Sequence, residues 1–348
     1  MKTLILHIGI SKTGSSALQV FWARNREPLA ARSFDYFAIG DYSMGAAGKI
    51  SSGNGAHLAR CLYPPGAGIY MDALPKHLDQ IDRLISASDC ETGILSSELF
   101  IDATDSGLIG FRTWLEERGI RLVMFYFIRQ QIDFIASSYI QVVKRHGYTG
   151  SLEQFVDTTL PSIKHIRYSA LYARLLSIVG SDQIICKNYT IAKRSPTGLF
   201  DAFLQSFGLD WTGLVNVTEQ VNPSLAPEEV AIMLAINKFR PRMELSDYIV
   251  NNAASVPNPR ATDVAEILPT PIRQKIRQYY ADDNQRFAQR YFGRDELFPL
   301  ADTTPDRSAE LTAGLSLEAA VDIFGGLMAR FDDRIAALES QLKAGRTK

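Results

Sequence analysis

The amino-acid sequence predicts an α/β fold, in which a parallel sheet is flanked by helices and followed by a helical C-terminal extension. Short aliphatic runs alternate with stretches of helical periodicity up to about residue 215. The longest run, residues 121–128, is apolar after its first residue, as in a central parallel strand covered on both faces. Beyond Asn222 only helical patterns follow. We therefore expect a core domain over residues 1–215 and a helical part over residues 216–348.

The individual elements are predicted from local periodicity and from the residues that end helices. Strands are expected at residues 3–8, 92–97, 121–128 and 183–187. Helices are expected around residues 17–22 and over 106–118, 130–145, 168–179 and 197–207, and then from Pro227 and over 272–292 and 316–342. The glycine-rich residues 40–68 and the proline-rich residues 241–271 are expected to be mobile loops.

Composition excludes several classes of protein. The 348 residues, 46% hydrophobic and 22% charged, are ordinary for a folded soluble chain and unlike disordered, collagen-like or coiled-coil sequences. A formal charge of −1 provides no overall field for nucleic acid or an anionic membrane. Positive charge is concentrated in two segments, with a net +4 over residues 1–60 and +6 over residues 121–200.

Cysteine usage and hydropathy bear on cellular location and on metal binding. The three cysteines, Cys61, Cys90 and Cys186, are far apart and form no CxxC pair, so neither a disulfide framework nor a zinc site is predicted. The longest apolar run has seven residues, whereas a membrane helix needs about 20. The N-terminus has no signal-peptide pattern. We expect a cytoplasmic protein without a membrane span.

The strongest candidate for a binding site is the loop of residues 9–16, GISKTGSS, which joins the first predicted strand to the first predicted helix. Such a loop directs backbone N–H groups and the positive end of a helix dipole at one point, which favours a phosphate group. The two glycines have the GxxxxG spacing of a P-loop, but the lysine stands at position 12, so the segment is not a Walker A motif. The alternative is a small-residue turn with an exposed lysine.

The segment HIGISKTGSSALQ resembles the 5′-phosphosulfate loop of PAPS-dependent sulfotransferases, in particular bacterial carbohydrate-type members. The family pattern is Pro-Lys-Thr/Ser-Gly-Thr-Thr, and here Ser11 replaces the proline or aromatic residue while Ser15 and Ser16 replace the threonines. The family also places an arginine at the end of a central strand and a serine eight residues later, and Arg129 and Ser137 match this spacing. Taken singly, they would be a solvated strand-end arginine and a helix-surface serine. Weaker similarity extends over most of the chain to about residue 300.

The resemblance implies a P-loop-kinase-like fold and a reaction that needs no metal. A sulfuryl group would pass from PAPS to an acceptor hydroxyl or amine, leaving adenosine 3′,5′-bisphosphate. Lys12 would stabilise charge on the bridging oxygen, and Arg129 and Ser137 would bind the 3′-phosphate. The 5′-phosphate would be bound by Lys12, Thr13, Gly14, Ser15 and Ser16.

The family's Arg-Lys-Gly element is absent as such. Lys193 and Arg194 lie near its expected place, either as 3′-phosphate ligands or as a solvated loop. The expected acceptor is a small molecule or glycan, with a carbohydrate or glycolipid hydroxyl favoured. The aromatic residues near the expected site suit a sugar face or a phenol equally well.

An acceptor hydroxyl needs a general base, and ligands of parallel sheets bind at the carboxyl ends of the strands. Glu98 follows the second predicted strand and is the first candidate, the alternative being a glutamate that complements a helix dipole. His57, in the glycine-rich stretch, is the second candidate, the alternative being an ordinary loop histidine.

Two other functions are consistent with a phosphate-binding loop. A small-molecule kinase would use ATP and Mg²⁺, but the third strand ends at Arg129 and carries no Walker B acid. A non-catalytic nucleotide-binding protein would keep both phosphate-binding elements without turnover. The amphipathic helix predicted over residues 316–342 is expected to pack on its own domain or to form a homodimer contact.

Overall fold

The computed structural model describes residues 2–49, 51–64, 73–217, 227–239 and 264–298, together with residues 305, 306, 308, 324, 328, 331–336 and 338. The chain forms two compact units. The first contains residues 1–130, 163–222 and 280–299, and the second contains residues 131–162, 223–279 and 300–348. Both units are discontinuous in sequence, and a domain boundary at residues 215 and 216 stays a prediction.

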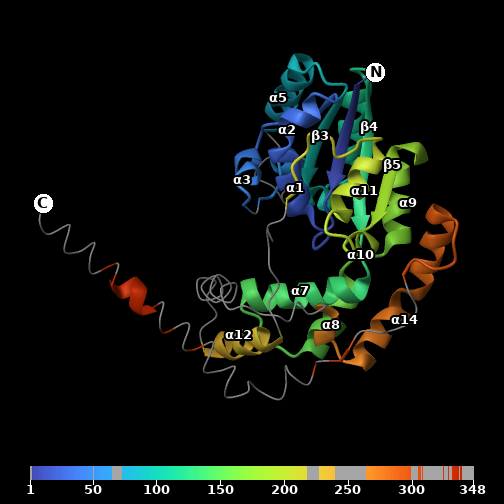
Figure 1. The fold of residues 1–348 in the computed structure, drawn as a ribbon. Helices are drawn as coiled ribbons and strands as arrows, with labels where there is room; N and C mark the ends of the chain where they lie inside the picture. The colour runs from blue at the N-terminus through green and yellow to red at the C-terminus, as the bar shows by residue number, and fades with distance from the viewer. Residues whose placement is uncertain are drawn as a thin grey trace, which may run out of the picture. The chain divides into compact units, whose positions relative to one another are not determined.

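The first unit is built on a five-stranded parallel sheet in the order β2-β3-β1-β4-β5, which confirms the predicted α/β fold (Figure 1). The strands are β1 (Lys2–Ile8), β2 (Phe34–Tyr36), β3 (Thr92–Ser97), β4 (Ile120–Ile128) and β5 (Ile184–Asn188). Four of them were predicted to within a residue or two. The edge strand β2 was missed, because three residues are too few to show an alternating pattern.

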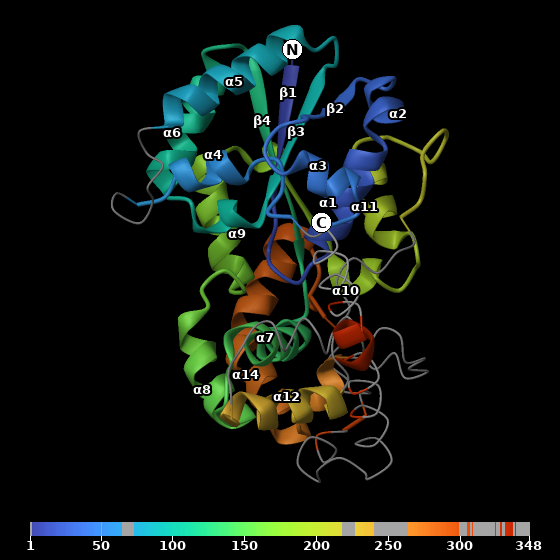
Figure 2. The same cartoon turned by 90° about the vertical axis from the view of Figure 1, so that its left-hand side faces the viewer.

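Helices cover both faces of this sheet (Figure 2). One face carries α1 (Ser15–Arg24), α3 (Tyr42–Ala46) and α11 (Gly198–Ser206). The other carries α4 (Ala56–Cys61), α5 (Leu74–Ala87), α6 (Asp105–Glu116) and α9 (Tyr168–Ile178). Shorter connecting helices are α2 (Arg26–Ala30), α10 (Tyr189–Ala192) and the 3₁₀ turns η2 (Glu98–Asp102) and η3 (Ser181–Gln183).

A core of aromatic side chains packs α1 against one face of the sheet. Alternate residues of β4, Phe125 and Phe127, belong to the same buried cluster as side chains of α1 and α11. Between those two helices, the ring of Phe21 stacks on Phe200 with centroids 4.5 Å apart, and Trp22 meets Phe203 edge-on at 5.1 Å. Each such buried side chain contributes roughly 1.5–3 kcal/mol. The loop that precedes α1 is therefore attached to a rigid helix.

The open edge of β5 is covered by residues 280–298, which contain the one-turn π-helix η5 (Ala288–Phe292). The hydroxyl of Tyr291 accepts a hydrogen bond from the Cys186 backbone N–H at 2.6 Å and donates one to the Ile184 carbonyl at 3.2 Å. The Asn188 amide donates to the Leu297 carbonyl at 3.3 Å. Tyr291 thus satisfies backbone groups that an edge strand would otherwise expose, and Asn188 ties the strand to the covering segment.

The second unit is helical in its described residues. It contains α7 (Gln131–His146), α8 (Leu152–Ser162), α12 (Pro227–Phe239), the 3₁₀ turn η4 (Val264–Ile267) and the first part of α14 (Thr270–Phe287). The Tyr139 ring of α7 packs on Phe155 of α8, with centroids 5.4 Å apart. Asn237 of α12 donates from Nδ2 to the Val143 carbonyl at 2.8 Å. These contacts join α7 to both neighbouring helices.

Some expectations differ from the structure or lie outside its described residues. The glycine-rich residues 40–68 contain the helices α3 and α4, so the expectation of one long loop was wrong there. The proline-rich residues 241–271 are described only from residue 264. Of the helix predicted over residues 316–342, residues 324, 328, 331–336 and 338 are described, and they are helical and exposed. The homodimer contact stays a prediction. Among the described residues, no helix is both long and apolar enough to span a membrane.

Candidate functional site

Polar residues follow four strands of the sheet at their carboxyl ends, which we call the carboxyl edge. The loop of residues 9–14 follows β1, Glu98 follows β3, Arg129 follows β4 and Tyr189 follows β5. Because the strands are parallel, their carboxyl ends lie at the same side of the sheet, where the strand arrows point in Figure 1.

Two glycines shape the loop after β1. The Gly9 N–H donates to the Ser97 carbonyl at 3.1 Å, and a Cβ on Gly9 would lie 2.8 Å from Cγ of Glu98. Only glycine therefore allows the loop to approach Glu98 this closely. Gly14 has φ 80°, and Lys12 also adopts the left-handed conformation, with φ 67°. The Thr13 hydroxyl donates to the Ile10 carbonyl at 2.5 Å and closes the turn.

The N-terminus of α1 is open to an anion. Gly14 is its N-cap residue, and no side chain caps this end. The first residue, Ser15, is only 2% exposed, and its hydroxyl lies beside the carboxyl of Glu98. An uncapped helix N-terminus with a hydroxyl in its first turn is a donor set that suits a phosphate oxygen. Ser16 follows in the same turn and is half-buried.

Arg129 reaches this loop from the end of β4. Its side chain is buried, with the residue 7% exposed, and Nη1 donates to the Lys12 carbonyl at 2.7 Å. The guanidinium carbon lies 5.4 Å from the centroid of the Tyr189 ring. Arg129 is thus not a solvated strand-end arginine, and the structure brings it together with the Lys12 main chain, while its role as a phosphate ligand stays a prediction.

Glu98 lies beside the same loop. Burial raises the pKa of its carboxyl, while the neighbouring Lys12 ammonium and Ser15 hydroxyl act in the opposite direction without cancelling the effect. A carboxylate with a raised pKa is better matched to taking up a proton near neutral pH. The structure therefore places the first candidate base next to the candidate anion site.

The segment that joins α10 to α11 borders the loop. A Cβ on Gly14 would lie 2.7 Å from Leu199 and 3.1 Å from Tyr189. Lys193 and Arg194 lie on the exposed turn between these two residues. Tyr189 and Leu199 were not predicted as parts of the site, because a tyrosine and a leucine in the first turn of a helix carry no signal for anion binding.

The remaining two predicted residues are not placed at the loop by any described contact. His57 lies on α4, and its ring stacks on His77 of α5, with centroids 5.6 Å apart and planes 9° from parallel. Ser137 is buried on α7, in the second unit, while Arg129 belongs to the first. Its pairing with Arg129 stays a prediction.

Asn54 is a residue of this edge that the sequence did not single out. Its Nδ2 donates to the carbonyls of Phe37 and Ile94, each at 3.0 Å, and its Oδ1 accepts the Ser96 N–H at 2.8 Å. The Ser97 hydroxyl donates to the Ser52 carbonyl at 2.7 Å. Residues 51–55 are thereby held over the end of β3, next to Glu98.

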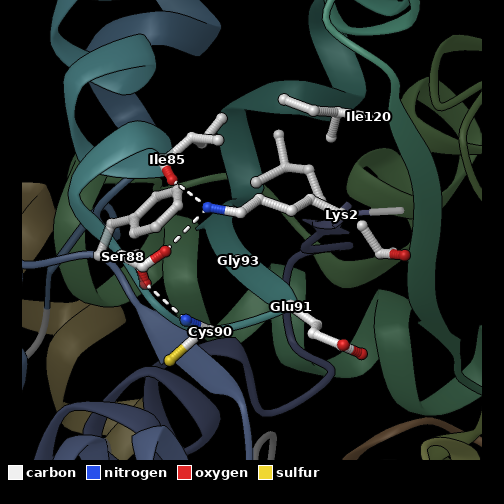
Figure 3. Close-up of a pocket in the computed structure, with 10 residues that line it drawn as sticks. Lys2, Ile85, Ser88, Cys90, Glu91, Gly93 and Ile120 are labelled. Atoms are coloured by element: carbon white, nitrogen blue, oxygen red, sulfur yellow. Dashed lines mark hydrogen bonds between the residues drawn. The ribbon is translucent and has the colours of Figure 1, made fainter.

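A small pocket lies at the opposite, amino ends of the strands, where Lys2 begins β1 and Ile120 begins β4 (Figure 3). The Lys2 ammonium crosses it and donates to the carbonyls of Ile85 at 2.5 Å and Ser88 at 2.8 Å. A cation at these carbonyls stabilises the C-terminal end of α5. None of the predicted site residues lines this pocket.

The fold and the geometry of its carboxyl edge define a parallel α/β protein with a candidate anion site. No protein-family model matches the sequence, and no curated protein matches it. Among solved structures, the chain is similar to the crystal structure of a sulfotransferase from Alicyclobacillus acidocaldarius, with 12% sequence identity and a TM-score of 0.46. The match covers 84% of this chain and 96% of that chain.

Proposed function

We propose that the protein is a PAPS-dependent sulfotransferase that transfers a sulfuryl group to an acceptor hydroxyl, with a carbohydrate or glycolipid as the favoured acceptor. The observation that carries the proposal is the bond from Arg129 Nη1 to the Lys12 carbonyl at 2.7 Å. This bond connects the loop of residues 9–16 with Arg129. The sequence resemblance assigns the loop to the 5′-phosphate of the donor and Arg129 to its 3′-phosphate.

The residues at the edge suit a ligand with two phosphate groups. The open N-terminus of α1, the Ser15 hydroxyl and the Lys12 ammonium would bind the 5′-phosphate end, and the Arg129 guanidinium would bind the 3′-phosphate. Lys193 and Arg194, on the turn beside Gly14, are proposed as further ligands of the 3′-phosphate.

The proposed reaction is an in-line displacement at sulfur, for which PAPS supplies the sulfuryl group. The acceptor oxygen forms a bond to sulfur while the bond from sulfur to the phosphate oxygen breaks. Glu98 takes the acceptor's proton, and Lys12 stabilises the negative charge left on the phosphate oxygen. The Lys12 ammonium acts on the pKa of the Glu98 carboxyl, which supports this division of roles.

Calorimetric titration of adenosine 3′,5′-bisphosphate, and separately of ATP with Mg²⁺, tests the donor. We expect the bisphosphate to bind and its affinity to fall about 100-fold, or ~2.7 kcal/mol, in Arg129→Ala. Arg121→Ala is the matched control, because Arg121 lies near the amino end of the same strand and pairs with Asp182. That change should leave the affinity as it is.

Transfer of label from ³⁵S-PAPS to a panel of sugars, glycolipids and phenols tests the reaction. Sulfated sugars or glycolipids are the expected products. A preference for ATP with Mg²⁺ would favour the kinase. Bisphosphate binding with no transfer to any acceptor would favour a non-catalytic nucleotide-binding protein.

A further inference from the structure

The backbone of Arg129 lies beyond the sheet's hydrogen-bond ladder. On one side of β4 the register ends at Ile128 opposite Asn188, and on the other it ends at Phe125 opposite His7. The Tyr168 hydroxyl satisfies both backbone groups of Arg129. It accepts the Arg129 N–H at 3.1 Å and donates to the Arg129 carbonyl at 2.5 Å.

Tyr168 is itself held firmly. It is fully buried on α9, and its ring packs against Phe287 at 6.1 Å and Phe298 at 6.3 Å between centroids. Burial raises the pKa of its hydroxyl, so the group stays protonated and able to donate. The segment of residues 280–298, which covers β5, therefore also packs against Tyr168 and holds it in place.

The next backbone group is fixed in the same way. The Gln130 N–H donates to the Thr190 hydroxyl at 2.9 Å, and Thr190 is buried on α10. The side chains of Tyr168 and Thr190 thus hydrogen-bond the main chain of Arg129 and Gln130, the two residues that follow the last paired residue of β4. With its main chain held, the Arg129 side chain extends to the Lys12 carbonyl and over the Tyr189 ring.

We propose that Tyr168 is a positioning residue, which sets the main chain at Arg129 and so directs the guanidinium to the anion loop. In the proposed sulfotransferase, Tyr168 would thereby determine the preference for ligands that carry a 3′-phosphate. This second part rests on the proposed function, whereas the fixing of Arg129 does not.

The test compares Tyr168→Phe with Tyr172→Phe, which removes a hydroxyl one turn further along α9 from a ring that also packs on Phe287, at 5.8 Å. Two quantities are measured: amide hydrogen exchange at Arg129 and Gln130, and the ratio of affinities for adenosine 3′,5′-bisphosphate and adenosine 5′-monophosphate. In Tyr168→Phe we expect exchange at Arg129 to rise at least about tenfold and the affinity ratio to fall about tenfold. Tyr172→Phe should change neither. Replacement of Tyr168 with 4-aminophenylalanine, which keeps a hydrogen-bonding group, should restore the ratio.

Unchanged exchange at Arg129 in Tyr168→Phe would overturn the proposal, as would an equal loss of affinity for both nucleotides, which indicates general damage. If the wild-type protein binds neither nucleotide, the proposed function fails and the exchange measurement still decides whether Tyr168 fixes Arg129. Faster exchange in Tyr168→Phe alone would then support that positioning, and equal exchange in the two variants would contradict it.

Discussion

The guanidinium of Arg129 donates to the carbonyl oxygen of Lys12 at 2.7 Å, across 117 residues of sequence. Lys12 has φ 67°, a left-handed conformation that costs a residue other than glycine about 1–2 kcal/mol. The charged hydrogen bond offsets part of that cost. Arg129 is therefore part of the loop's structure as well as a candidate ligand for an anion.

Arg129→Lys keeps the positive charge but loses the planar fork that can meet a carbonyl and an anion together. We expect adenosine 3′,5′-bisphosphate affinity to fall about tenfold, or ~1.4 kcal/mol, and hydrogen exchange in residues 10–16 to rise. Calorimetry and exchange mass spectrometry measure the two effects. Wild-type affinity in this variant would mean that charge alone suffices at this position.

Glu98→Gln removes the candidate base with little change of shape. The rate of sulfuryl transfer should fall about 10²–10⁴-fold, while bisphosphate affinity stays equal or rises, because a negative charge beside Lys12 is lost. Since burial raises the pKa of Glu98, the wild-type rate should fall with decreasing pH at a higher pH than an exposed carboxyl would give. The contrasting variant is His57→Ala, which should keep most of the rate. A nearly intact rate in Glu98→Gln would remove Glu98 from the mechanism.

Gly14→Ala combines backbone strain with a steric clash. An alanine there must keep φ near 80° and place its Cβ 2.7 Å from Leu199. We expect the free energy of unfolding in urea to fall by about 2 kcal/mol or more. Gly119→Ala is the control, because Gly119 has φ 66° with open space around it. In this variant the free energy of unfolding should fall by only about 1 kcal/mol. Equal losses in the two variants would show that Leu199 moves aside freely.

His7 should make the stability of the protein depend on pH. Its imidazole is fully buried and donates to or accepts from the Ser96 hydroxyl at 2.8 Å, and burial lowers its pKa from 6.5 to about 3. Protonation thus favours the unfolded chain. The free energy of unfolding should fall as pH decreases from about 6.5 to about 3, by up to about 1.4 kcal/mol per pH unit from this group.

The check is urea unfolding across this pH range in His7→Asn, which cannot titrate and should show a shallower slope than the wild type. His146→Asn, a change at an exposed histidine of α7, should leave the slope unaltered. Parallel slopes for the wild type and His7→Asn would contradict the buried, neutral state of His7.

The sequence by itself determined the parallel α/β fold and the loop of residues 9–16, because both depend on local patterns. A short apolar run, a glycine turn and an amphipathic helix are each formed by residues close together in the chain. Arg129 was singled out by the family resemblance, since the local pattern alone would make it a solvated arginine at the end of a strand. The roles of these residues in catalysis stay predictions.

Only the tertiary structure decided which distant groups meet. Arg129 holds Lys12, Tyr168 holds Arg129, and Asn54 fixes residues 51–55 at β3, in each case through one to three hydrogen bonds between residues up to 117 positions apart. The attachment of residues 280–298 to the edge of β5 likewise depends on a few side chains, Tyr291 and Asn188. Such bonds leave no periodic signal, because one polar side chain is enough to make them and the sequence surrounding it can vary freely.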